Sequence, residues 1–135
     1  MTTTDPTVGD VIGVAEFRAS LRRFLRRSER IARQSGLTPQ RHLLLLMIKG
    51  APDGSERSTV TELAERLQLA QSTVTELVSR AEEAGLVERE PSTTDGRVAY
   101  LRLSAEGEER LGKAFTHLEA ERRQLREVFS HLDGN

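Results

Sequence analysis

The chain has 135 residues, of which 36% are hydrophobic and 30% are charged, and its formal net charge is −1. This length suits one compact subunit, and so polar a composition places much of the apolar surface on amphipathic helices. The absence of cysteine excludes disulfides, thiolate metal sites and cysteine redox sensing. No apolar run approaches the roughly 20 residues that span a bilayer. The first residues also lack the apolar run of a signal peptide, so we expect a cytoplasmic protein without a membrane partner.

Charge is distributed unevenly along the chain. Eighteen of the 20 basic residues are arginines, and seven of these lie between positions 18 and 33. The simpler interpretation is that these arginines are solvated and pair with acids such as Glu16 and Glu29. The alternative is that some line a pocket for an anion or lie near a DNA backbone. The segment 58–84 is acidic, so DNA binding there would depend on a few well-placed contacts and on helix N-termini.

The N-terminal third predicts two helices. Asp10 can cap a first helix that runs to about residue 35, and Gly36 ends it. Thr38 and Pro39 then begin a second helix in the favoured order of cap residue and proline. The apolar run 43–48 would by periodicity alone also suit a buried strand, but this beginning favours a helix. The first helix has one apolar stripe, formed by Val14, Phe17, Leu21, Phe24, Leu25, Ile31 and Ala32.

Two short helices separated by a tight turn are predicted between residues 59 and 85. Thr59 and Glu62 form a capping box for the first. In the second, the spacing of Val74, Leu77, Val78 and Ala81 gives a buried face. The opposite face carries short hydroxyl and amide groups, which can reach phosphates and base edges in a major groove about 12 Å wide; an ordinary polar helix surface is the alternative. The candidate DNA contacts on this helix are Gln71, Ser72, Thr73, Thr75, Glu76, Ser79 and Arg80.

A hairpin follows, with strands near residues 86–89 and 98–103. Asp95 and Gly96 are a favoured pair for a tight hairpin turn. Arg97 beside the tip could enter a narrow minor groove, and we expect Asp95 to hold either Arg97 or Arg89. The sequence gives little support for a strand before residue 59. Helix, turn, helix and hairpin together predict a mainly α fold with a small β wing, the winged helix-turn-helix, which reads DNA.

A long last helix is predicted from a Ser104 cap to about Leu132. It would be roughly 40 Å long, more than the small winged lobe can cover. Its far half therefore needs the apolar stripe of the N-terminal helix or a second copy of the chain. Its apolar residues follow a heptad register in which Arg122 takes the skipped position: Leu111, Phe115, Leu118, Leu125, Phe129 and Leu132.

Several stretches together resemble the MarR family of bacterial transcription regulators: 72–78, 82–89, Asp95 to Arg97, and 101–107. The resemblance covers nearly the whole chain. It implies a homodimer in which 10–35 and 104–132 are dimerisation helices and 37–103 is the DNA-binding lobe. Such a dimer would read a near-palindromic operator, would usually repress, and would be released by a small aromatic or anionic ligand.

Carried over by position, the resemblance places a recognition helix at Gln71 to Arg80 and a wing at Asp95 and Arg97, with Arg89 and Thr94 as further candidate DNA contacts. Candidate dimer residues are Val14, Phe17, Leu118, Leu125, Phe129 and Leu132. Candidate ligand-pocket residues are Phe17, Leu21, His42, Leu45, Arg110 and Phe115.

Other functions have less support in the sequence. The three histidines are scattered and none has a partner histidine four residues on, so we expect no metal and no cofactor. No spacing brings together a nucleophile, a base and an orienting group, so an enzyme is not expected. The acidic second helix of the helix-turn-helix leaves one alternative, a winged helix that contacts another protein instead of DNA.

Overall fold

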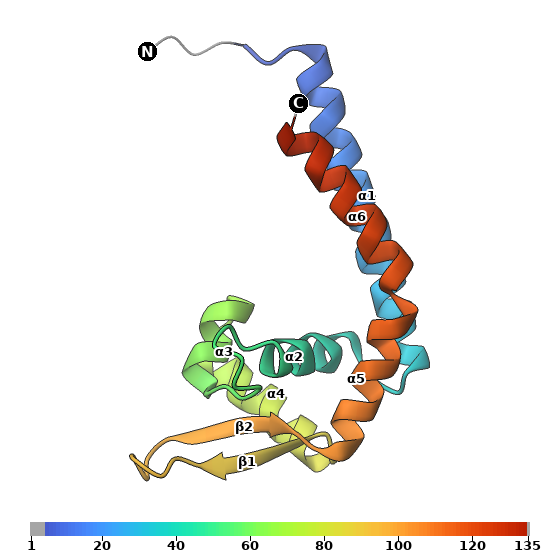
Figure 1. Cartoon of the computed structure of the whole chain (residues 1–135). Coiled ribbons are helices and arrows are strands. Elements are labelled where there is room, and N and C mark those ends of the chain that lie inside the picture. Colours follow the sequence, from blue (N-terminus) through green and yellow to red (C-terminus); the bar gives the residue numbers. More distant parts are fainter. Residues whose placement is uncertain (1–4, 135) are drawn as a thin grey trace.

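The computed structural model describes residues 5–134 as a small lobe from which two helices project together (Figure 1). The lobe contains three helices, a two-stranded antiparallel sheet and a fourth helix that leads back out of it. The projecting pair, which we call the stalk, consists of α1 and α6 lying side by side and antiparallel. The elements are α1 Val8–Gln34, α2 Pro39–Lys49, α3 Val60–Leu67, α4 Gln71–Glu83, β1 Val87–Pro91, β2 Ala99–Leu103, α5 Ala105–His117 and α6 Glu119–Gly134.

Local capping chemistry sets most of the helix beginnings. The hydroxyls of Thr38, Thr59 and Ser104 accept hydrogen bonds from backbone N–H groups in the first turns of α2, α3 and α5. The expected start of α1 is wrong by three residues: Thr7 is the cap, and Asp10 is the third helical residue of a capping box with it. Gly36 ends the α1 region as predicted, with a positive φ of 81° that suits glycine.

One apolar core holds the lobe together. The fully buried side chains at its centre come from α2, α3, α4, the sheet and the residue just before β1, and they include Leu44, Leu45, Ile48, Leu63, Val74, Val78, Leu86 and Leu101. The run 43–48 is helical, as the Thr38 and Pro39 start predicted. Ser58 adds a short bridge to Leu101 through two backbone hydrogen bonds of 3.1 and 2.8 Å. The weakly supported strand before residue 59 therefore exists only as a single bridge.

The predicted long C-terminal helix is two helices, and the break lies at Leu118. This side chain is only 3% exposed because it turns inward and packs on Ile31 and Ala114. Arg122 stabilises the break: its guanidinium donates to the carbonyl of Phe115 at 2.7 Å and lies 3.7 Å from the centre of the Phe115 ring. The residue that interrupts the heptad pattern therefore bridges the junction between lobe and stalk.

Candidate DNA-binding surface

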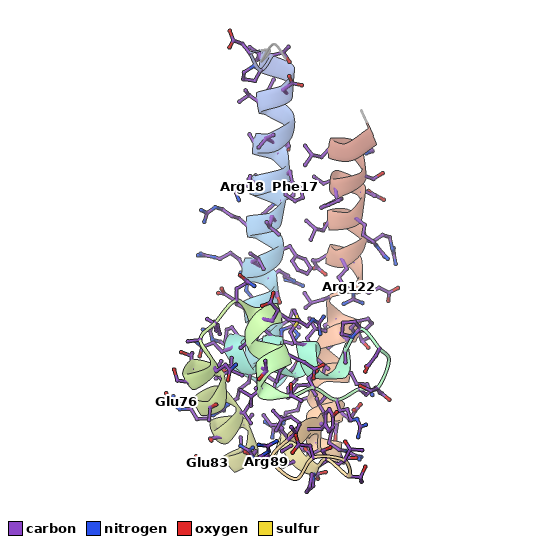
Figure 2. The ribbon with its side chains drawn as sticks, turned by 90° about the vertical axis from the view of Figure 1, so that its left-hand side faces the viewer. Phe17, Arg18, Glu76, Glu83, Arg89 and Arg122 are labelled. Carbon is purple, nitrogen blue, oxygen red and sulfur yellow. The ribbon has the colours of Figure 1, made fainter. Side chains whose placement is uncertain are left out.

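Helix α4 has one face in the core and the other open to solvent. Val74, Val78 and Ala81 are fully buried, which fixes the rotation of the helix. The stripe directly opposite carries Ser72, Glu76, Ser79 and Glu83, of which only Ser79 is half-buried. Figure 2 shows Glu76 and Glu83 projecting from the outer side of α4. The predicted polar face is thus free to meet a partner.

The N-terminus of α4 differs from those of α1, α2, α3 and α5. Each of those four helices begins at a serine or threonine whose hydroxyl accepts a first-turn N–H. Helix α4 begins at Ala70, whose methyl group cannot accept a hydrogen bond. The first-turn N–H groups at Gln71, Ser72 and Thr73 are therefore available to an external acceptor, and a phosphate oxygen suits the positive end of a helix dipole.

All three arginines predicted to contact DNA are paired with carboxylates. Arg80 donates to Glu76 Oε1 at 2.7 Å, across one helical turn. Arg89 Nε donates to both oxygens of Glu82, each at 3.0 Å, so this arginine joins β1 to α4. Of the two expected partners for Asp95, Arg89 is wrong and Arg97 is right: the Arg97 Nε lies 3.4 Å from the Asp95 carboxylate.

The hairpin tip is a loop of residues 92–98, which contains a tight turn from Asp95 to Val98 where Asp95 and Gly96 favoured one. The loop closes through hydrogen bonds from the Ser92 N–H to the Val98 carbonyl and from the Val98 N–H to the Asp95 carbonyl. Inside it, Ser92 Oγ accepts from the N–H groups of Thr94 and Asp95, and Asp95 accepts from the N–H of Arg97 at 3.0 Å. These bonds organise the backbone while the Arg97 side chain stays 93% exposed.

The wing strands carry a charged cluster near the tip loop, which the sequence did not predict. Arg57, in the loop before α3, donates to Glu90 of β1 at 3.1 Å and lies 4.2 Å from the centre of the Tyr100 ring of β2. Arg102 is 3.5 Å from the other oxygen of Glu90. The strand register places Glu90 opposite Tyr100, so Arg57 contacts both strands at one level. No local motif predicts these contacts, because 33 residues separate Arg57 from Glu90.

A groove of about 380 Å³ lies where the lobe meets the stalk. Two of the six predicted pocket residues, His42 and Phe115, line it. Burial lowers the pKa of His42 below its ordinary value of 6.5, because the charged imidazolium is penalised away from water. The remaining lining is mostly apolar and includes Phe24, Leu25, Leu43, Leu46, Leu118 and Arg122.

The other predicted pocket residues lie elsewhere. Leu45 is fully buried in the core. Arg110 donates to the carbonyl of Gly36 at 2.8 Å and pairs with Glu106, which ties α5 to the end of α1. Phe17 and Leu21 lie half-buried on the stalk, where Phe17 meets Phe129 edge to face with ring centres 5.5 Å apart. Figure 2 shows Phe17 on the side of α1 that faces α6 and Arg18 on the opposite side.

The residues predicted to join two chains fall into two groups. Val14, Phe129 and Leu132 are exposed along the stalk, and Phe17 and Leu125 are half-buried between α1 and α6. Leu118 is enclosed by its own subunit at the break between α5 and α6. It therefore has almost no surface left for a second chain, and its expected dimer role does not fit this placement.

Within residues 5–134 no helix is both long and apolar enough to cross a membrane. The same part of the chain holds no group of three or more histidine or acidic side chains arranged to bind a metal ion.

Comparisons with known proteins agree with this geometry. Residues 35–98 match the family model described as MarR family. The fold is similar to that of AbsC, a MarR family transcriptional regulator from Streptomyces coelicolor, with a TM-score of 0.70 and 24% identity over 91% of this chain and 82% of that one. No curated protein sequence gave a match.

Two further solved structures have the same fold. Wild-type MarR from E. coli, in its apo form, has a TM-score of 0.68 and 18% identity over 92% of this chain and 86% of that one. A mutant of MepR from S. aureus, solved bound to an oligodeoxyribonucleotide, has a TM-score of 0.66 and 19% identity over 84% of this chain and 81% of that one. The winged lobe therefore matches the MarR family of transcription regulators, and most of the chain shares the fold of solved proteins of that family.

Proposed function

We propose that the chain works as a homodimer that binds a near-palindromic DNA operator through α4 and the wing and represses transcription until a small ligand releases it. The match of the winged lobe to the MarR family supports a DNA-binding regulator and not an enzyme. The observation that carries the proposal is the exposed, uncapped start of α4 beside a wing tipped by Arg97, at the end of the molecule far from the stalk (Figure 1).

The geometry of α4 suits a major groove. Because one face of α4 is buried, its row of short polar side chains points outward. The first-turn N–H groups of α4 can position the helix on a phosphate. The wing packs against the same helix through Arg89 and Glu82, so the two elements approach DNA as one body. Arg97 then extends toward the neighbouring minor groove.

The stalk supports a second copy as the partner. Pairing of α1 with α6 inside one subunit still leaves large apolar side chains exposed, among them Val11, Ile12, Val14, Phe129 and Leu132. Burying this surface in a symmetric contact is favourable at about 25 cal/mol per Å² of apolar area, before the entropy cost of association. Two lobes would then be held at a fixed separation.

The groove at the junction suits a small effector with an aromatic ring and an acidic group. Its walls are mostly apolar, and its polar lining comes from Arg122 and His42 together with Ser28, Glu29 and Gln40. It lies between α2 of the lobe and α1 and α5, so an occupant would change the angle of the lobe on the stalk. Such a ligand would act by favouring a dimer geometry that does not match the DNA.

The test is selection of bound sequences from a random duplex library, followed by titration of the selected duplex at several salt concentrations. We expect a two-part, near-palindromic consensus and an affinity that falls steeply with salt. Equal binding to all sequences, or none, would contradict the proposal and favour a winged helix that contacts protein.

A further inference from the structure

Glu76 lies on the outward face of α4, near the middle of the helix. It lies opposite the buried Val74 and Val78, one turn after Ser72, and its side chain is 64% exposed. Figure 2 shows it at the outer edge of the lobe. A helix that enters the major groove with this face forward carries the Glu76 carboxylate toward the floor of the groove.

The negative charge of a carboxylate in the major groove must be compensated by a hydrogen-bond donor or a cation. The phosphates on both sides of the groove repel it, and most atoms on the base edges are acceptors that cannot bond to it. The donors available there are the amino groups of cytosine N4 and adenine N6, and carboxylates are suited to cytosine N4. An acid on the outward face of a DNA-reading helix therefore weakens binding to most sequences and favours those that present such a donor.

We propose that Glu76 is a specificity-determining residue that accepts a hydrogen bond from the N4 amino group of a cytosine in each half-site. The proposal rests on the function proposed above, because it requires α4 to lie in a major groove. It adds a predicted base preference, cytosine, at the one position of each half-site that Glu76 contacts.

Arg80 is the positioning residue for Glu76. It donates to Oε1 at 2.7 Å, which leaves Oε2 for a donor outside the protein. The two residues are one helical turn apart, and the positive charge of Arg80 reduces the repulsion between the Glu76 carboxylate and the phosphates. Arg80 itself is 64% exposed and need not contact a base to have this effect.

Glu83 offers a matched control on the same stripe. It is also an exposed acid of α4, but it is the last residue of the helix, about 10 Å beyond Glu76 along the axis. Residues near the start of such a helix make the base contacts, so Glu83 should not read a base. Replacing either acid removes one negative charge, and only the Glu76 change should alter sequence preference.

The experiment combines protein variants with single-base changes in the selected duplex. For the wild-type chain, replacing the contacted cytosine by thymine should weaken binding roughly 5- to 150-fold, because thymine presents an acceptor there. Glu76→Ala should bind both duplexes within about twofold of each other, whereas Glu83→Ala should keep the full discrimination. Glu76→Gln should move the preference to adenine, which a glutamine amide can bond through N6 and N7.

Several outcomes would overturn the inference. If Glu76→Ala tightens binding to all duplexes equally and selects the wild-type consensus, the carboxylate acts only as a repulsive charge. If Glu83→Ala loses the same preference, the effect belongs to the acidic stripe in general. A wild-type chain that selects no sequence would instead refute the proposed function, and circular dichroism of each variant separates all these results from misfolding.

Discussion

Arg97 is the most accessible cation of the proposed DNA surface. Asp95 organises the backbone on which it stands but leaves its guanidinium in solvent. Arg97→Ala should weaken binding to the operator by about 1–3 kcal/mol and leave the folded subunit unchanged. Lys113→Ala, which removes an exposed cation from α5, is the control and should have little effect in the same titration. Equal loss in both variants would mean that only overall charge matters.

His42 makes stability depend on pH. Burial lowers its pKa in the folded chain, so below about 6.5 the unfolded chain binds a proton that the folded chain does not. The free energy of unfolding should therefore fall as pH is lowered through 6.5 and should stop responding to this group below the folded-state pKa. Urea unfolding between pH 7 and pH 5 measures this slope, and His42→Gln should reduce it. An unchanged slope would show that His42 is not the group responsible.

At the scale of single residues, caps and local polar contacts were predictable from sequence. Thr59 with Glu62 and Thr38 with Pro39 act within one turn, so their spacing contains the information. The pairing of Asp95 with Arg97 is local in the same way. The partner of Arg89 was not predictable, because Glu82 becomes its neighbour only when β1 returns beside α4.

The junction of the wing with α5 depends on a glycine. A β-carbon at Gly107 would overlap the carbonyl oxygen of Leu86, which is close because Ser104 bonds to both Gly85 and Leu86. Gly107→Ala should cost about 1–3 kcal/mol of stability through this overlap. Gly112→Ala in the same helix meets nothing within 4 Å and should be neutral or stabilising by about 1 kcal/mol. Thermal unfolding of the two variants measures both stability changes. Similar unfolding midpoints would contradict the close contact between residue 107 and the Leu86 carbonyl oxygen.

Arg57 holds the two wing strands together near the tip loop. Arg57→Leu removes the contacts to Glu90 and Tyr100 and should increase the mobility of both strands. These groups are partly exposed, so the stability loss should be about 1 kcal/mol or less. Operator affinity should also fall, because Glu90 and Tyr100 lie one residue pair before the loop that carries Arg97. Hydrogen exchange of the β1 and β2 amides is the measurement, with Arg102→Leu, whose pairing distance is longer, as the milder comparison.

At the scale of elements, helices with one clear apolar stripe were predictable and their interruptions were not. In the sequence the heptad register continues through residue 118. In the structure the helix is interrupted there, because Leu118 packs inward on Ile31. That choice depends on the end of α1, more than 80 residues earlier. The bridge at Ser58 is likewise stabilised by β2 and not by its own propensity.

The stalk determines assembly in the proposed dimer. Phe129 is 58% exposed and touches Phe17 of its own chain, so an acid there would place a charge in the apolar contact between subunits. Phe129→Asp should shift the chain toward monomers and weaken operator binding. Sedimentation checks the mass, with Glu127→Gln, an exposed change two residues away, as the control. A Phe129→Asp chain that stays dimeric would place the dimer contact elsewhere.

The most direct test of a paired DNA reader is a hydroxyl-radical footprint on the selected duplex, combined with the measured number of chains per duplex. Two chains should protect two symmetric half-sites whose centres lie about one helical turn, or roughly 34 Å, apart. Protection of a single half-site by one chain, or no localised protection, would contradict the proposed dimer and its reading of DNA.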